Sequence, residues 1–175
     1  CIKLGDQDAS EKYLQQIDPE QQDVQLQKQI LQSEIHIRRG DPVASLSILE
    51  GLRDVVERSG ASALAQQFQI NLALGLFKQG RGAEAVTEYQ KGIVIAEALD
   101  DELGQARLLG NLGNLYTRID PVGEIETARS CFERATEIFH QLGHLDMETI
   151  CRVGLANVGF YQGQLEEASS MYSQA

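Results

Sequence analysis

Four side chains that can bind a metal ion stand close together in the chain, at His140, His144, Asp146 and Glu148. Two histidines four residues apart share one face of an uninterrupted helix, where they can bind one zinc ion. Gly143 stands between them, and glycine commonly ends a helix. We therefore expect the helix to end between the two histidines, so that no metal site forms and no cofactor is bound.

Other patterns of catalysis are missing from the sequence. No serine, histidine and acid stand in a recognisable catalytic motif. Gly80-Arg81-Gly82 precedes an expected helix, but no strand comes before it and the spacing of a phosphate-binding loop is absent. Glu166-Glu167 stands near an expected helix start, where the helix dipole favours negative charge. We therefore do not predict an enzyme.

Three cations, Arg38, Lys78 and Arg118, follow one another at intervals of 40 residues. If the elements that carry them stack regularly, they form a row that can select an acidic peptide or a carboxylate, and Arg107 can extend it. A cation in the last turn of a helix also stabilises the helix dipole without any partner. Both interpretations stay open.

The composition favours an all-helical protein that binds no nucleic acid. Apolar residues make up 42% of the 175 residues, aromatic residues only 6%, and there are three prolines. The formal net charge is −11, which is opposite to the basic surface that phosphate contacts need. This charge favours solubility, or alternatively a basic partner.

The cysteines and the ends of the chain suggest a cytoplasmic fragment. Cys1, Cys131 and Cys151 are odd in number and lack metal-binding spacing, so we expect reduced thiols. No apolar run approaches the roughly 18 residues that span a bilayer, and no signal peptide is visible. The chain starts without methionine and inside a repeat, so we expect a fragment of a longer protein.

A pattern of small and large apolar residues repeats along the chain. A small residue is followed by an apolar residue four positions later and another three after that, which places all three on one helix face. The first members are 35, 40, 43 and 40 residues apart. The sets are Ser10/Leu14/Ile17, Ser45/Leu49/Leu52, Ala85/Tyr89/Gly92, Ala128/Phe132/Ala135 and Ala168/Tyr172/Ala175.

Turn residues recur at fixed places in the same repeat. Gly5, Gly40, Gly80 and Gly163 each stand five residues before a small residue, where glycine can close the preceding helix. A second series, Gly60, Asp100 and Gly143, should end the second helix of each pair. Asp41-Pro42 and Asp120-Pro121 both resemble a helix start, with aspartate as the N-cap. Three extra residues at the second of these are expected to extend its helix backwards.

These signals predict a single array over residues 1–175. It has a partial repeat at 1–20 and repeats at about 22–60, 61–100, 101–143 and 145–175. The expected helices cover residues 7–17, 22–39, 42–58, 61–79, 82–99, 101–118, 121–142, 145–162 and 164–175, with no strand and no linker.

The repeat resembles the tetratricopeptide repeat (TPR) family, in its long form of about 40 residues. The best match is Leu112-Gly113, Tyr116, Ala128, Phe132 and Ala135, within the stretch GNLGNLY and the helix that follows it. Less complete matches surround Leu72-Ala73 and Leu155-Ala156, and the repeat around Ser45 is degenerate. The long repeats of polarity adaptors, kinesin light chains and bacterial regulators are similar. The resemblance implies a right-handed α-α superhelix of antiparallel helix pairs, whose first helices line a concave groove.

In this family, asparagines beside the Leu-Gly motif often contact a bound peptide backbone, since an amide both donates and accepts hydrogen bonds. Carried over by position, they are Asn71, Asn111, Asn114 and Asn157. Their alternative role is a hydrogen bond between helices, or a solvated surface. With the cations, the groove candidates are Asn71, Lys78, Arg107, Asn111, Asn114, Arg118 and Asn157.

The resemblance implies a protein–protein interaction module that binds a peptide segment of a partner protein, with an acidic or carboxylate-bearing segment as one option. Nucleic acid and membrane are not expected partners. The alternative is a ligand- or peptide-sensing domain of a larger bacterial signalling or transcription regulator. Self-association through the ends of the array is also open, because a cut array exposes apolar surface.

Overall fold

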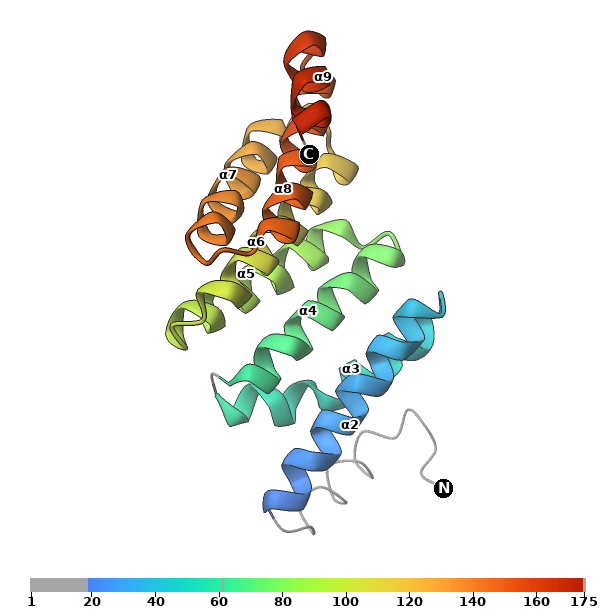
Figure 1. Ribbon diagram of the computed structural model, residues 1–175. Helices are drawn as coiled ribbons and strands as arrows, with labels where there is room; N and C mark the ends of the chain where they lie inside the picture. Colours follow the sequence, from blue (N-terminus) through green and yellow to red (C-terminus); the bar gives the residue numbers. More distant parts are fainter. Residues whose placement is uncertain (1–18, 61, 175) are drawn as a thin grey trace. The chain divides into compact units, whose positions relative to one another are not determined.

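The computed structural model describes residues 19–60 and 62–174, and every regular element within these ranges is an α-helix (Figure 1). The expected helix at 7–17, with Gly5, Ser10, Leu14 and Ile17, lies outside the described residues, as does Cys1. The helices are α2 (Pro19–Arg38), α3 (Pro42–Ser59), α4 (Ala63–Lys78), α5 (Gly82–Ala98), α6 (Glu102–Ile119), α7 (Ile125–Gln141), α8 (Leu145–Tyr161) and α9 (Leu165–Gln174).

These helices belong to two compact units, which divide between Ile95 and Ala96 near the end of α5. The first unit contains α2, α3, α4 and most of α5, and the second contains α6 to α9. Within the described residues, no helix is both long enough and apolar enough to cross a membrane.

The turn residues act as the repeat predicts. Gly40, Gly80 and Gly163 have φ between 78° and 79°, and Gly60, Asp100 and Gly143 also have positive φ. Five of the described helices end with the same backbone pattern, in which the third residue after the helix donates a hydrogen bond to a carbonyl five residues back. The bonds are Asp41–His36, Arg81–Leu76, Asp101–Ala96, His144–Phe139 and Gln164–Gly159, each 2.9 Å long.

One of the two predicted aspartate N-caps is confirmed and the other is wrong. Asp41 accepts a hydrogen bond from the backbone of Ala44 at 3.0 Å and starts α3. Asp120 makes the same kind of bond, to the backbone of Gly123 at 2.8 Å, but the residues after it form a turn and α7 begins only at Ile125. The extra residues therefore form a turn and do not extend the helix backwards.

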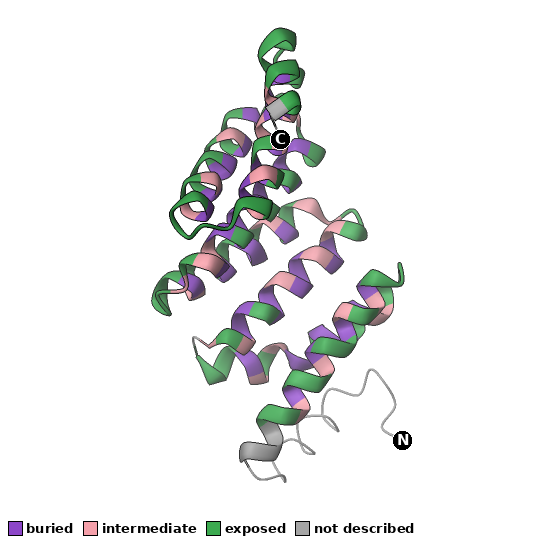
Figure 2. Cartoon of the chain, viewed as in Figure 1, coloured by how far each residue is buried: buried purple, intermediate pink, exposed green. Residues whose placement is uncertain are grey.

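The first unit is held together by large apolar side chains from α2, α3 and α4, which lie on the inner faces of these helices (Figure 2). Ile30, Leu49, Phe68 and Leu72 are each at most 1% exposed. Burying such a side chain contributes roughly 1.5–3 kcal/mol. The predicted set Ser45, Leu49 and Leu52 is buried in α3 as expected.

The second unit is organised around Phe132 of α7. A Cβ atom placed on Gly113 of α6 would lie 3.0 Å from the Phe132 ring, and one on Gly154 of α8 would overlap the ring outright. The ring therefore fills a space that two glycines, one on each neighbouring helix, leave open. Leu112, Gly113 and Tyr116 are buried against this core, as the sequence predicts.

Candidate functional site

Four polar residues form one exposed face of α6. Arg107, Asn111, Asn114 and Arg118 are spaced by four, three and four residues, and all four are exposed. Such spacing places their side chains in a line along one side of a helix. We refer to these four residues as the α6 stripe.

The rest of α6 is built to hold this stripe in place. Asp101 caps the helix by accepting a hydrogen bond from the backbone of Gly104 at 2.9 Å. Leu108, Leu112 and Leu115, which lie between the stripe residues in sequence, are at most 4% exposed. The buried leucines fix the rotation of α6 about its own axis. The α6 stripe therefore faces outward, where solvent or a partner can contact it.

The two asparagines of the stripe differ in their bonding. Asn114 donates its amide N–H to the carbonyl of Gly110 in its own helix at 3.1 Å. Asn111 makes no side-chain hydrogen bond to any residue in the described part of the chain. An amide that is exposed and not engaged can both donate to and accept from a peptide backbone.

Helix α8 lies next to α6 and carries the remaining asparagine of this unit. A Cβ atom on Gly110 of α6 would be 3.4 Å from the sulfur of Cys151 on α8, so the two helices approach closely. Asn157 is half-buried, and its carbonyl accepts a hydrogen bond from the hydroxyl of Tyr172 on α9 at 2.6 Å. Asn157 therefore already serves as a link between helices.

Asn71 follows the alternative interpretation given for the asparagines. It is only 2% exposed, and its amide donates to the carbonyl of Ile30 at 3.0 Å and to the hydroxyl of Ser33 at 3.2 Å. Its own carbonyl accepts from Gln67 at 2.9 Å. These bonds join α4 to α2, so we remove Asn71 from the groove candidates. The sequence gives little sign of this role, since the residue 40 positions before Asn71 is Leu31, and the bonded Ser33 lies two positions further on.

The three cations of the predicted row belong to two different units. Arg38 and Lys78 end α2 and α4 of the first unit, whereas Arg118 ends α6 of the second. Arg38 binds Glu34 of its own helix, with nitrogen–oxygen distances of 2.6 and 3.0 Å. Lys78 is exposed. For Arg38, a local role at the helix end accounts for the contacts observed.

Of the four metal-ligand residue types near His140, only His140 and Glu148 are brought together, with Arg152 as a third partner. Gly143 ends α7 with φ of 73°, so His140 and His144 lie on either side of a turn. His140 lies 3.1 Å from a carboxylate oxygen of Glu148, and Arg152 lies 2.6 Å from the other oxygen. Hydrogen bonding to His140, and secondarily to Arg152, lowers the pKa of Glu148. Among the described residues, no group of three or more His, Cys, Asp or Glu can hold a metal ion.

The cysteines of the second unit are unsuited to nucleophilic chemistry. Cys131 and Cys151 are free and buried, and burial raises the pKa of each thiol to about 11. Because the thiolate is the reactive form, both remain unreactive near neutral pH.

The class of fold is identified by comparison with solved structures. No family model matches the chain, and no curated protein matches its sequence. Solved structures match it well, and the fold is that of the TPR-like helical repeat proteins. The predicted all-α, TPR-like fold class is thereby confirmed.

Three of these structures illustrate the likeness. Aspartyl phosphate phosphatase F from Bacillus subtilis matches 86% of this chain with 17% identity and a TM-score of 0.73. A Rap protein complexed with Competence and Sporulation Factor matches 98% with 15% identity and a TM-score of 0.76. TPR-like repeats of a putative kinesin light chain from Podosopora anserina match 86% with 17% identity and a TM-score of 0.72. The chain spans 39%, 46% and 72% of these three structures, respectively, so it covers less than half of the first two.

Proposed function

We propose that the chain is a protein–protein interaction module whose second unit binds a peptide segment of a partner protein along the α6 stripe. The observation that carries this proposal is the stripe itself, with four exposed polar side chains in one line on a helix that is otherwise largely buried. A row of amides and guanidinium groups suits an extended backbone, which offers donors and acceptors at regular intervals.

The two arginines give the stripe a preference for charge. Arg107 and Arg118 lie at its two ends, with the asparagines between them. Guanidinium groups bind carboxylates in paired hydrogen bonds, so a peptide with acidic residues or a free C-terminal carboxylate fits best. Asn157 remains a predicted contributor, as a neighbour on α8. Lys78 is an exposed cation of the first unit and remains a prediction for that unit by itself.

The Rap protein complexed with Competence and Sporulation Factor supports a binding function, since it is a protein of this fold with a bound factor. Interaction is proposed in place of catalysis, although one protein of this fold is named a phosphatase. A cytoplasmic location, with neither membrane nor nucleic acid as partner, belongs to the same proposal. The described residues give no support to the alternative of a sensor in a larger bacterial regulator.

The test starts by selecting peptides that bind the chain from a displayed random library, and measuring the best one by titration calorimetry. Replacing both asparagines (Asn111→Ala with Asn114→Ala) should weaken binding about tenfold, because two hydrogen-bonding amides are lost. The melting temperature should not fall, since both side chains are exposed and alanine is the better helix former.

The matched control replaces two exposed polar residues of α7 that are also three apart, Thr127→Ala with Ser130→Ala. It should bind the peptide like the unaltered chain. Unchanged affinity and melting in the double asparagine variant would show that the α6 stripe is not the binding site.

A further inference from the structure

Two large apolar side chains are exposed on α8, the helix that lies beside α6. Ile150 is 55% exposed and Tyr161 is 54% exposed. They stand eleven residues apart, which is close to three full turns, so both lie on one face of α8. We refer to these two residues as the α8 row. Exposed apolar side chains that gather beside polar ones mark a contact surface.

The helices α6 and α8 run in the same direction. A Cβ atom on Gly110 of α6 would lie 3.4 Å from the sulfur of Cys151 on α8. Three residues further along each helix, Gly113 and Gly154 both meet the ring of Phe132. Because these contacts advance together along both helices, the start of α8 lies beside the start of α6.

The α8 row faces the same side of the unit as the α6 stripe. The first residues of α6 and α8 are 43 positions apart, and the buried residues Leu115 and Val158 keep this offset. The two residues of the α8 row stand 43 positions after the two arginines of the α6 stripe. In parallel helices of successive repeats, positions with the same offset point to the same side. The two rows therefore lie next to each other.

The two rows have the same length and suit an extended peptide. Each covers eleven residues of helix, which is about 16 Å at 1.5 Å per residue. An extended chain rises about 3.3 Å per residue, so about five of its residues cover this length. Its successive side chains point to opposite sides. A peptide that lies between the rows and along them therefore turns alternate side chains towards α6 and towards α8.

The two rows differ in chemistry. The α6 stripe ends in guanidinium groups, which bind carboxylates, whereas the α8 row offers an aliphatic chain and an aromatic ring. The ring of Tyr161 makes a T-shaped contact with Phe160, which is itself 56% exposed and extends the apolar surface. Apolar side chains of a peptide would remove this surface from water, which favours binding.

We propose that the partner segment is an extended peptide in which acidic and apolar residues alternate. The acidic side chains contact the α6 stripe, and the apolar side chains contact the α8 row. This inference rests on the proposed function of the α6 stripe and adds the apolar half of the recognised pattern. The apolar residues then distinguish the partner from other acidic segments.

The test uses two pentapeptides of equal charge with acetylated and amidated ends, Glu-Leu-Glu-Leu-Glu and Glu-Ser-Glu-Ser-Glu. Binding is followed by shifts of backbone amide signals in NMR titrations of the whole chain. The leucine peptide should bind about tenfold more tightly than the serine peptide, because its apolar side chains cover the α8 row. It should shift the signals of Asn111, Ile150 and Tyr161.

A third peptide tests the alternation itself. Glu-Glu-Glu-Leu-Leu has the composition of the leucine peptide, but it cannot turn its acidic side chains to one side and its leucines to the other. It should bind several-fold more weakly than the alternating peptide.

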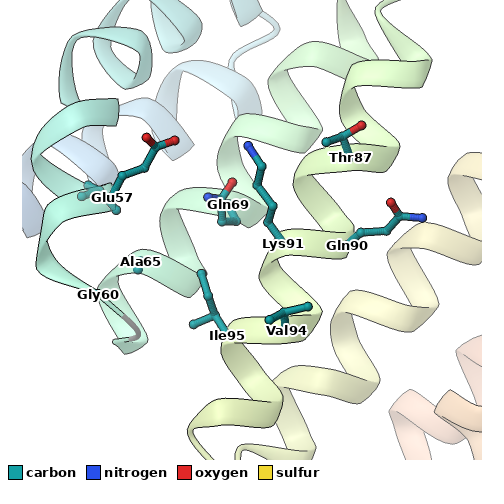
Figure 3. Close-up of a pocket in the computed structure, with 10 residues that line it drawn as sticks. Glu57, Gly60, Ala65, Gln69, Thr87, Gln90, Lys91, Val94 and Ile95 are labelled. Atoms are coloured by element: carbon teal, nitrogen blue, oxygen red, sulfur yellow. The ribbon is translucent and has the colours of Figure 1, made fainter.

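Two variants locate the apolar contact. Ile150→Ala with Tyr161→Ala should remove the preference for leucine over serine and leave binding of the serine peptide unchanged. Ile150→Ala alone keeps the contact between Tyr161 and Phe160 and should remove part of the preference. The matched control replaces two aliphatic side chains of similar exposure outside the row. These are Leu145→Ala (67%) at the start of α8 and Val94→Ala (63%) at the pocket that α3, α4 and α5 line in the first unit (Figure 3). The control should keep the full preference.

The inference is overturned if the leucine and serine peptides bind equally, if the rearranged peptide binds as tightly as the alternating one, or if the double variant and its control behave alike. The α6 stripe stands in each case when Asn111→Ala with Asn114→Ala still weakens binding of the serine peptide. Unchanged binding of every peptide to that asparagine variant would instead contradict the proposed function. If none of the three peptides binds, the inference fails, and the library peptide decides the proposed function.

Discussion

Asparagines at the same position of successive repeats do different work in this protein. Asn71 and Asn111 are 40 residues apart and precede the same motif, yet Asn71 is buried and Asn111 is exposed. The difference arises because α2 offers Asn71 a backbone carbonyl at Ile30 and a hydroxyl at Ser33. One residue type thus serves packing in the first unit and lies exposed in the second.

This difference predicts that the same substitution has a large effect on stability at Asn71 and a small one at Asn111. Asn71→Ala should lower the free energy of unfolding by about 2 kcal/mol, because it removes bonds between α4 and α2 and leaves a buried gap. Asn111→Ala should change it by less than about 0.5 kcal/mol, as exposed positions usually do. Denaturant unfolding of both variants measures this, and similar losses in the two would show that the burial of Asn71 is not what matters.

Glu148 makes part of the stability depend on pH. Its pKa is lowered in the folded chain by hydrogen bonding to His140 and by Arg152, so the folded state holds this proton less tightly than the unfolded state. The stabilisation is therefore present above the unfolded pKa of about 4.3, and it is lost as the pH falls through the lower folded pKa.

Glu148→Gln should accordingly flatten the decline in stability below about pH 4.5. Thermal melting between neutral and acid pH, compared with the unaltered chain, gives the difference in slope. Glu133→Gln, which changes an exposed carboxylate of α7, serves as the control and should keep the original decline. Equal curves for Glu148→Gln and the unaltered chain would contradict the assigned role.

At the scale of the helices, local signals in the sequence predicted most boundaries. The apolar period, the turn glycines and Asp41 gave helix ends that agree with the structure to within a few residues. The start of α7 was missed because Asp120 and Pro121 look the same before a helix as before a turn. The capping bond does not distinguish the two sites, since Asp41 and Asp120 each accept from the backbone N–H three residues later, at 3.0 and 2.8 Å.

The packing of α6 and α8 around Phe132 depends on two glycines that have no other local reason to be in a helix. Gly154→Ala should destabilise the chain by about 1–3 kcal/mol, because the added methyl group overlaps a ring that Gly113 confines on the other side. Thermal or denaturant unfolding measures the loss.

Gly51→Ala provides the control, since it also lies within a helix but has open space at its Cβ position. It should be neutral or stabilising by up to about 1 kcal/mol, as alanine is the better helix former. Equal stabilisation by both substitutions would show that Phe132 can move aside.

For the molecule as a whole, the net charge of −11 opposes the approach of an acidic peptide to the α6 stripe, the binding site that we propose. An acidic chain repels an acidic peptide at long range, whereas Arg107 and Arg118 attract it at contact. At physiological ionic strength, salt largely screens the interaction between exposed charges that are more than about 8–10 Å apart.

We predict that the selected peptide, if acidic, loses affinity as the salt concentration rises. In the bound state its attraction to the two arginines outweighs the long-range repulsion by the acidic chain, and salt weakens that attraction. Arg107→Ala with Arg118→Ala should weaken binding at low salt and make the remaining affinity less sensitive to salt. Titrations at several salt concentrations measure the slope. An unchanged slope in this variant would mean that the charge preference arises elsewhere.

The sequence by itself determined the helical repeat, most helix ends and the buried faces, because apolar period, capping residues and turn glycines act through near neighbours in the chain. Only the tertiary structure decided which polar residues are left for binding. It buried Asn71 through groups about 40 residues away and tied Asn157 to Tyr172. Each outcome depends on which helices pack together, and no local pattern encodes that.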